Sequence, residues 1–204
     1  MKSLELFPVT IFKTEIEDND LLKDILVSKI LEESEAMLIP EDWTTTKLKT
    51  SFSDESEIIE KYRDLLEKEY IECMRDIFDK EFNVKIQNIW FNVYTDGEYQ
   101  EYHDHVGTLL RPSHFSFIHF LSFDKDNHKP PEFRDPLGQI RNLSLELDRN
   151  RCGEVYVPDV KEGDLLMFPS YLQHCVPAWK KTDYPRITIS FNVKVLQYGD
   201  DKSY

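Results

Sequence analysis

Apolar side chains recur at two spacings along the chain, and the change from one spacing to the other divides the sequence in two. In residues 21–31 and again in 58–82 they recur every three or four positions, which predicts two amphipathic helices. Asp18 or Asn19 can serve as the N-cap of the first helix. Before it, residues 6–13 have the apolar alternation of an extended segment. The first part of the chain is therefore predicted to form one strand and two helices.

From Val84 onward the period changes to two, and β-branched and aromatic residues dominate. Strand patterns cover residues 84–94, 113–123, 154–157, 164–168 and 186–196. Turn-forming pairs of Gly, Asp and Pro lie between them. Helices followed by many antiparallel strands predict an α+β domain built on a β-sandwich or jelly roll, with the N-terminal helices packed on the sheet.

The composition fits one globular domain in a reducing compartment. The 204 residues are 40% hydrophobic, enough for one core, so we expect a single domain over residues 1–204.

A net charge of -14 without a basic stripe argues against nucleic acid as a partner. Glu5 and Pro8 interrupt the N-terminus and no segment approaches 18 apolar residues, so we expect neither a signal peptide nor a membrane span. Three cysteines without a CxxC pair are typical of a cytoplasmic protein.

One predicted strand has a face made entirely of polar side chains. Its apolar face holds Ile187, Ile189, Phe191 and Val193, and its polar face holds Arg186, Thr188, Ser190 and Asn192. Such a strand is either an edge strand with a wet outer face or part of a barrel interior that holds an anion. A second strand favours the interior, because one of its faces also mixes hydrogen-bonding and aromatic groups. That face holds Asn88, Trp90, Asn92 and Tyr94.

Three of the six histidines are placed where they can share a metal ion. His103 and His105 flank Asp104, and on extended backbone residues i and i+2 project to the same side while the residue between them points away. His174 follows a predicted strand, and Arg186 opens the polar-faced strand 12 residues later. Imidazoles are common transition-metal ligands, so the pattern predicts a metal with open positions and, beside it, a bound carboxylate.

In these motifs the chain resembles the Fe(II)/2-oxoglutarate-dependent oxygenase superfamily, in particular a bacterial and phage group related to prolyl 4-hydroxylases. The resemblance spans nearly the whole chain, and its most specific part is GDLLMFPSYLQHCVPAW followed by RITISFNV. The other matching pieces are LFPVTIF, Trp43-Thr44-Thr45, NIWFNVY, residues 97–105 and Phe133-Arg134-Asp135-Pro136.

The resemblance implies a double-stranded β-helix, which is a jelly roll, whose open end holds Fe(II) on His103, His105 and His174. It also implies an enzyme that uses 2-oxoglutarate and O2 to hydroxylate an amino-acid side chain or a related small metabolite. The substrate would then be a small molecule or a peptide.

The same resemblance implies roles for the residues around the co-substrate. Arg186 would bind the distal carboxylate of 2-oxoglutarate, assisted by Thr188 or Ser190. Asn92 and Tyr94 would contact the co-substrate or support the residues that do. Bidentate pairing of a guanidinium with a carboxylate is directional as well as strong, so lysine would be a poor substitute for Arg186.

The chain departs from the usual family triad of histidine, carboxylate and distant histidine, because His105 stands at the carboxylate position. H-x-H suggests a three-histidine site, in which the iron site is one unit more positive and could also admit zinc. Asp104 is the chief alternative ligand, and Glu101 is another.

Two rival functions remain open at this point. One is a catalytically silent jelly-roll module that uses the pocket for ligand recognition or phage assembly. The other is a three-histidine dioxygenase that does not use 2-oxoglutarate. The helix over residues 58–82 could cover its own sheet or a partner's, which leaves a homodimer open.

Other parts of the sequence are given structural interpretations. We expect His114, His119 and His128 to be ordinary surface or core histidines, although His119 could line the pocket. Trp90 and Trp179 are predicted to be packing residues. Residues 124–151, rich in charge and proline, are interpreted as a loop over the mouth of the site.

Overall fold

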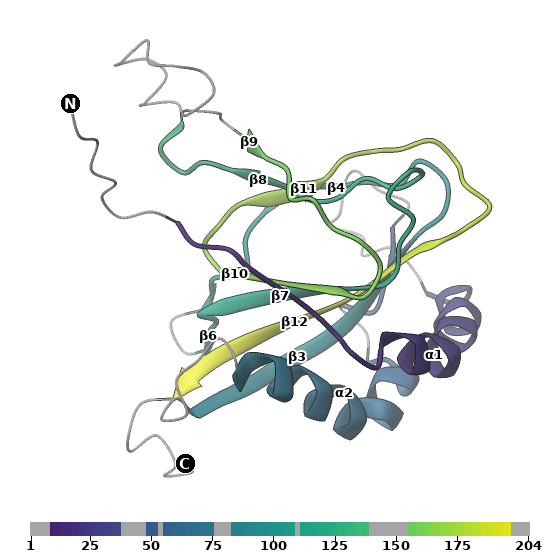
Figure 1. Cartoon of the computed structure of the whole chain (residues 1–204), viewed down its shortest axis with the longest axis horizontal. Coiled ribbons are helices and arrows are strands. Elements are labelled where there is room, and N and C mark those ends of the chain that lie inside the picture. Colours follow the sequence, from purple (N-terminus) through teal and green to yellow (C-terminus); the bar gives the residue numbers. More distant parts are fainter. Residues whose placement is uncertain are drawn as a thin grey trace.

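The computed structural model has two layers of β-sheet and two helices, and the helices cover the outer face of one sheet (Figure 1). It describes residues 9–37, 48–52, 55–75, 83–108, 111–138 and 155–196. The predicted α+β class is confirmed. Trp43 to Thr45 and residues 139–151 of the predicted loop lie outside the described residues.

Both helices begin close to where the apolar periodicity predicts. α1 spans Asn19–Ser34 with Asp18 as its N-cap, and α2 spans Glu57–Arg75. Residues 76–82 of the predicted second helix lie outside the described part of the chain. The Ser56 hydroxyl accepts a hydrogen bond from the Ile59 amide at 3.0 Å, which satisfies one of the free N–H groups at the start of α2.

The strands range from two to twelve residues in length. They are β1 Phe12–Glu15, β2 Lys49–Thr50, β3 Asn83–Tyr94, β4 Gln100–His103, β5 Gly107–Thr108, β6 Arg111–Pro112, β7 Phe115–Ser122, β8 Glu132–Arg134, β9 Val155–Tyr156, β10 Asp164–Pro169, β11 His174–Val176 and β12 Arg186–Leu196. The long strands β3, β7, β10 and β12 are those that the alternation predicts. The sequence analysis did not find β4, β8 and β11, because three or four residues are too few to show a period.

The larger sheet has six strands in the order β1-β10-β7-β12-β3-β2, and its neighbouring strands are antiparallel. β12 pairs with β7 on one side and with β3 on the other, so it is a central strand and the edge-strand alternative is wrong. Its apolar residues, from Ile187 to Val193, lie in the main hydrophobic core with apolar residues of α1 and α2. Its polar face therefore points to the other side of the sheet, which is the interior between the two layers.

The smaller sheet faces that interior and has the order β4-β11-β8-β9 (Figure 1). It is built from the short strands, and β11 pairs with both β4 and β8. The interpretation of residues 124–151 as a loop is wrong for residues 132–134. These form β8, because Phe133 is buried and its strand pairs with β11 through His174. The segment is thus partly a layer of the fold.

His119 is a core histidine of β7 that joins the sheet to both helices. Its Nε2 donates to Asn19 Oδ1 at 2.8 Å, so its Nδ1 is the acceptor for the Tyr70 hydroxyl at 3.1 Å. The ring is fully buried. The structural interpretation of His119 is confirmed, and the alternative that it lines the pocket is wrong, because its ring lies on the helix side of the sheet.

Replacing His119 by leucine is expected to lower the free energy of unfolding by about 2 to 4 kcal/mol, because the Tyr70 hydroxyl and the Asn19 amide would each lose a buried partner. Urea unfolding followed by circular dichroism measures the change. A loss below about 0.5 kcal/mol, the size of an ordinary surface effect, would contradict this role.

The same ring makes stability depend on pH. Burial lowers the pKa of His119 to about 3 from 6.5. Between these values the unfolded chain holds a proton that the folded chain does not, so stability is full above pH 6.5 and falls as the pH drops toward 3. His119→Gln, which keeps hydrogen-bonding groups but cannot titrate, should reduce this slope by up to about 1.4 kcal/mol per pH unit relative to wild type.

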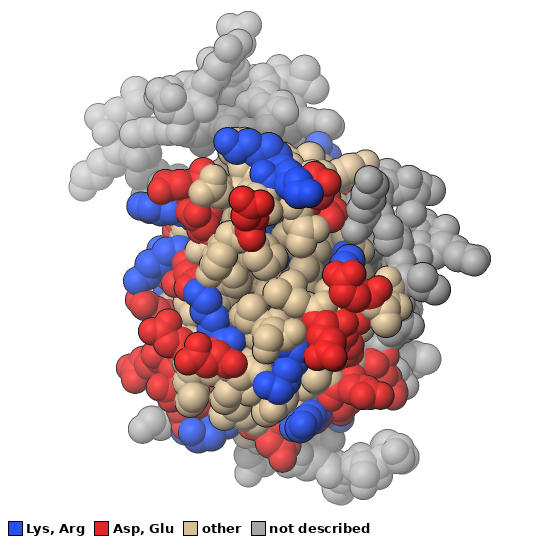
Figure 2. Space-filling model, turned by 90° about the vertical axis from the view of Figure 1, so that its right-hand side faces the viewer, with Lys and Arg blue, Asp and Glu red and all other residues tan. Residues whose placement is uncertain are grey.

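Acidic and basic side chains are interspersed over the face drawn in Figure 2. Within the described part of the chain, no helix has both the length and the apolar character needed to cross a membrane.

Candidate functional site

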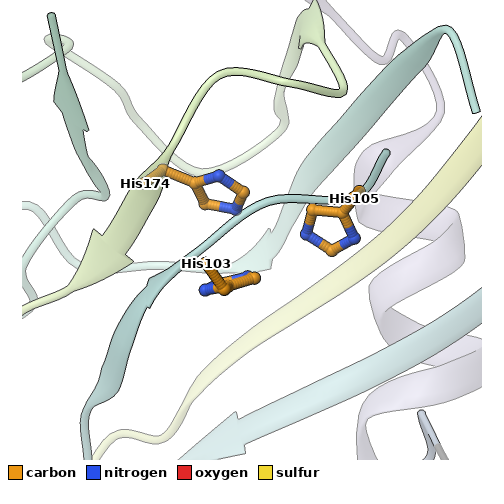
Figure 3. Close-up of side chains that lie close together, drawn as sticks. All are labelled: His103, His105 and His174. Carbon is orange, nitrogen blue, oxygen red and sulfur yellow. The ribbon is translucent and has the colours of Figure 1, made fainter. Parts of the chain in front are cut away.

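Backbone pairing brings three histidines to one place between the sheets. β4 and β11 are antiparallel, and His103 lies directly opposite His174, so their side chains project from the same face of the smaller sheet. His105 follows two residues after His103, and its amide donates to the Ser170 carbonyl at 2.8 Å, which holds this part of the chain beside β11. The three rings point toward one another in Figure 3.

The rings are close enough to share one ion. The ring centroids of His103 and His174 are 4.3 Å apart, and those of His105 lie 4.9 Å from His103 and 5.2 Å from His174. One ring nitrogen from each histidine lies within 4.8 Å of the other two. Within the part of the chain that the structure describes, these three histidines are the set of histidine, cysteine or acidic side chains that could hold a metal ion together.

Hydrogen bonds to the main chain select the nitrogen that each ring can offer. His103 Nδ1 donates to the Glu101 carbonyl at 2.8 Å, and His174 Nδ1 donates to the Leu172 carbonyl at 3.1 Å. Because Nδ1 carries the proton in both rings, Nε2 has the free lone pair. A backbone carbonyl on the second nitrogen is the usual support of a metal-binding histidine.

Burial keeps the three imidazoles neutral. It lowers the pKa of His105 to about 3 and the pKa of His174 well below its usual value, and the neighbouring histidine rings lower both further. Burial also lowers the pKa of His103, against a smaller opposing effect of its hydrogen bond to the Glu101 carbonyl. Neutral rings have the free lone pairs that a cation needs.

Aromatic side chains support the rings from the side. Trp90 of β3 stacks on His105 with centroids 5.5 Å apart and 26° between the planes. Phe168 and Phe133 lie against His174, at 4.8 Å and 5.6 Å between centroids. Trp90, predicted as a packing residue, therefore packs against a residue of the site itself.

The two carboxylates that the sequence analysis kept as alternative ligands lie elsewhere. Asp104 is exposed, and its Oδ1 accepts a hydrogen bond from the Val106 amide at 3.3 Å. Glu101 is exposed as well, and its main-chain carbonyl is the group that meets His103. Neither belongs to the cluster of possible metal ligands, so the geometry favours His105.

Arg186 is a buried cation at the start of β12. Only 3% of the residue is exposed, and its guanidinium carbon lies 4.4 Å from the centroid of the Tyr94 ring, with Phe120 and Phe123 at 5.8 and 5.9 Å. Its Nε and Nη1 have no hydrogen-bond partner among the described residues. A buried guanidinium with free N–H groups is costly unless an anion accepts from it, so this position has the chemistry of an anion site.

Arg186 and the three histidines line one cavity of about 370 Å³, as do the other residues that the sequence analysis selected. Those residues are Asn92, Tyr94, Thr188 and Ser190. Asn92 Nδ2 lies 3.4 Å from both Thr188 Oγ1 and Ser190 Oγ, so this polar wall is held together by its own hydrogen bonds. The expectation of a barrel interior with hydrogen-bonding walls agrees with this arrangement.

The cavity also has walls that the sequence analysis missed, Gln100, Ser116 and Phe168. Gln100 accepts from the Tyr94 hydroxyl at 3.3 Å, and Ser116 donates to Asn192 Oδ1 at 2.7 Å. Ser116 gave a usable signal, because it is a polar residue in the apolar strand pattern of residues 113–123. Gln100 gave none, because a single glutamine in a short polar segment resembles any loop residue.

The remaining described histidines make structural contacts. His128 accepts from the Asp124 amide at 2.9 Å and donates to the Tyr184 carbonyl at 2.7 Å, which ties the loop after β7 to the loop before β12. His114 accepts from the Val195 amide at 2.9 Å. These contacts agree with their interpretation as ordinary histidines.

The residues present fit a divalent metal and a neighbouring carboxylate. Three neutral imidazoles leave coordination positions open on a six-coordinate metal, and imidazole suits iron as well as zinc. Arg186, with two nitrogens that lack acceptors, lines the same cavity. A small molecule with a chelating end and a carboxylate end would satisfy both groups together.

The sequence model of one protein family, described as "Putative 2OG-Fe(II) oxygenase", matches residues 88–192, which is slightly more than half of the chain and includes the three histidines and Arg186. No curated protein matches the sequence.

Solved structures with similar folds come from several organisms. A Pseudomonas putida prolyl-4-hydroxylase has a TM-score of 0.57 at 12% identity, over 93% of this chain and 94% of that one. HygX from Streptomyces hygroscopicus, with nickel and 2-oxoglutarate bound, has a TM-score of 0.55 at 12% identity, over 91% and 82% of the two chains. EctD from S. alaskensis, with 2-oxoglutarate and 5-hydroxyectoine, has a TM-score of 0.61 at 14% identity, over 91% and 72%. At these identities the similarity concerns the fold.

Proposed function

The chain belongs to the 2OG-Fe(II) oxygenase family and is a 2-oxoglutarate- and Fe(II)-dependent oxygenase, and we propose that His103, His105 and His174 bind its iron while Arg186 binds its co-substrate. The observation that carries this assignment is the shared cavity, which is lined by the three imidazoles and by a buried guanidinium whose Nε and Nη1 lack a partner among the described residues. The two layers of antiparallel sheet support the finer description of the fold as a double-stranded β-helix.

When bound, Fe(II) and 2-oxoglutarate supply, with O2, an oxidant that hydroxylates a C–H bond of a substrate and leaves succinate and CO2. The chain's own residues hold, orient and shield these reactants. Arg186 would donate two N–H groups to the distal carboxylate as a bidentate partner and so would orient the co-substrate. Thr188 and Ser190 line the same cavity and would offer hydroxyl groups to it.

The aromatic side chains around the site exclude water from it. Trp90, Phe168 and Phe133 surround the histidine rings, and Tyr94 stacks on Arg186. In such a low-dielectric site the pairing of guanidinium with carboxylate is stronger than in water. The same walls limit side reactions of the bound reactants with solvent.

Three neutral ligands leave the full charge of a divalent ion in the cavity. A site with two histidines and a carboxylate would neutralise one of the two charges, whereas here neither is neutralised until the chelating carboxylate of the co-substrate binds. We therefore expect 2-oxoglutarate, a dianion, to bind much more tightly to the metal-loaded protein than to the metal-free protein.

The proposed substrate is an amino-acid side chain, in a free amino acid or a peptide, or a small metabolite. The solved structures with similar folds support this range, since they include a prolyl-4-hydroxylase, a structure with hygromycin B and one with 5-hydroxyectoine.

Slow formation of succinate in the absence of a substrate tests the function. The Fe(II)-loaded protein should convert 2-oxoglutarate to succinate in air with ascorbate present, and the zinc-loaded protein should not. Succinate is measured by mass spectrometry. Tight binding of 2-oxoglutarate without any succinate would instead favour a silent binding module, and absence of binding to the folded, iron-loaded protein would favour a dioxygenase that does not use 2-oxoglutarate.

A further inference from the structure

A second cavity lies on the other side of Arg186. It has a volume of about 310 Å³ and is formed by the turn after β3, the loop after β7 and the loop before β12. Tyr94, Val176 and Arg186 line both this cavity and the one with the histidines, so the two cavities meet at these three residues. We call it the Trp179 cavity, after the tryptophan in its wall.

Positive side chains gather at the Trp179 cavity in a chain that is otherwise strongly acidic. Lys129 Nζ lies 4.3 Å from the centroid of the Trp179 ring, and Lys180 Nζ lies 5.9 Å from it. Arg186 supplies a third cation. Both lysines therefore lie on the aromatic wall of the cavity, where their charges act on the same small volume.

The acidic residues of the cavity do not fully cancel this charge. Glu98 is buried, and its Oε2 accepts from the Thr95 and Asp96 amides while its Oε1 accepts from the Thr95 hydroxyl at 3.0 Å. These bonds hold the carboxylate against its own turn. Burial raises the pKa of Tyr94 in the cavity wall, and the charge of Glu98 still adds to this. Glu98 and Asp96 thus offset two of the three cations and leave an excess of one positive charge. Asp96 is exposed to solvent, and burial together with Arg186 lowers the pKa of His128, which keeps that ring neutral.

Arg186 has more hydrogen-bond donors than one carboxylate can use. Its Nε and Nη1 carry three N–H groups and have no partner among the described residues. A bidentate carboxylate in the histidine cavity accepts from Nη2 together with either Nε or Nη1, so it uses one of these three N–H groups. At least one donor of this buried side chain remains for an acceptor in the Trp179 cavity, which Arg186 also lines.

We propose that the Trp179 cavity is a second anion site that takes a small dicarboxylate, with one carboxylate at Arg186 and the other at Lys129 and Lys180. The proposal rests on the proposed function in one respect, that the co-substrate occupies the opposite side of Arg186. Succinate, which the reaction releases beside Arg186, belongs to this chemical class. The site needs no metal, since none of its groups is a metal ligand of the proposed centre.

The three tryptophans of the chain allow each cavity to be observed separately. In a Trp43→Phe/Trp90→Phe protein the remaining fluorophore is Trp179, and in a Trp43→Phe/Trp179→Phe protein it is Trp90 beside His105. Succinate is titrated into the metal-free Trp43→Phe/Trp90→Phe protein at constant ionic strength. We expect a saturable change of Trp179 fluorescence, no change with uncharged succinamide, and at least about tenfold weaker binding of acetate, which has one carboxylate.

Charge variants decide whether the response comes from the proposed site. Lys129→Gln with Lys180→Gln should raise the succinate dissociation constant at least about tenfold, and Lys129→Arg, which keeps the charge, should change it less than threefold. Equal binding to the double variant, or binding of acetate as tight as that of succinate, overturns the proposal. Circular dichroism confirms that each variant is folded.

The Trp43→Phe/Trp179→Phe protein, in which Trp90 is the remaining tryptophan, separates this proposal from the proposed function. Metal-loaded and kept without O2, it should report binding of 2-oxoglutarate, and the two lysine substitutions should change that binding less than twofold. If Trp90 fluorescence responds to 2-oxoglutarate in its variant but Trp179 fluorescence does not respond to succinate in the other, the second site alone is overturned. If Trp179 responds to succinate and Trp90 does not respond to 2-oxoglutarate, the second site stands and the proposed function is contradicted.

Discussion

Replacing Arg186 by glutamine is expected to weaken 2-oxoglutarate binding about 30- to 4,000-fold, because breaking a buried hydrogen-bonded charge pair costs about 2 to 5 kcal/mol. The glutamine removes the charge and the forked donor geometry together. Arg186→Lys keeps the charge on a shorter point-like group, so we expect a smaller but still large loss. Calorimetry on the protein loaded with Mn(II), without O2, measures the dissociation constants.

Arg134→Gln is the matched control. In the wild type, the guanidinium carbon of Arg134 lies 4.1 Å from the centroid of the Tyr102 ring, so Arg134 too is an arginine on an aromatic face. Arg134 does not line the histidine cavity. The variant's dissociation constant for 2-oxoglutarate should stay within about twofold of wild type. Equal affinities of wild type and Arg186→Gln would contradict the role of Arg186.

Arg186→Gln should not destabilise the ligand-free protein. Arg186 is buried and burial lowers its pKa, so its charge is a cost that the fold carries in the absence of an anion. We therefore expect Arg186→Gln to unfold at the same urea concentration as wild type or a higher one. This result would separate a binding role from a purely structural one, in which the substitution lowers stability.

Replacing His174 or His105 by asparagine is expected to weaken Fe(II) binding at least about 100-fold, since even residues that only support a metal ligand cost 10- to 100-fold in affinity when removed. Competition with a coloured chelator, under anaerobic conditions, measures the affinity. Asp104→Asn is the control that tests the alternative ligand, and we expect its affinity to stay within about twofold of wild type. A large loss in Asp104→Asn together with little change in His105→Asn would show that the carboxylate is the third ligand.

Much of the larger sheet could be predicted because its strands are long. β12 shows four apolar residues on one face and four polar residues on the other, which indicates a strand with one side in the core. The similar face of residues 88–94 favours a polar interior on its other side. Helix α2 is similarly clear from its apolar stripe. The period of two also places three residues of β12 on the face that lines the site, Arg186, Thr188 and Ser190.

The smaller sheet could not be predicted from local pattern. β11 has three residues, and its pairing with β4 is what sets His174 opposite His103. That register depends on contacts between segments about 70 positions apart in the sequence, which no local period records. The spacing of His103 and His105 predicts two rings on one side, and the place of His174 after a predicted strand makes it a candidate third ligand. That its ring meets the other two depends on the pairing of β4 with β11.

The interpretation of residues 124–151 failed for a related reason. Charged residues and prolines surround Phe133, so the composition indicates a loop, whereas the buried Phe133 and its pairing with β11 make residues 132–134 a strand. Tertiary packing decides the state of so short a segment, and its own propensity has little weight.

The central claim is that three imidazoles bind one iron ion beside Arg186, and a crystal structure of the protein loaded with Fe(II) and 2-oxoglutarate without O2 tests it most directly. The anomalous signal of iron should lie on a single site bonded to His103, His105 and His174, with the distal carboxylate of 2-oxoglutarate paired with Arg186. An iron ion held by Asp104 or Glu101 in place of His105, or a carboxylate bound away from Arg186, would contradict it.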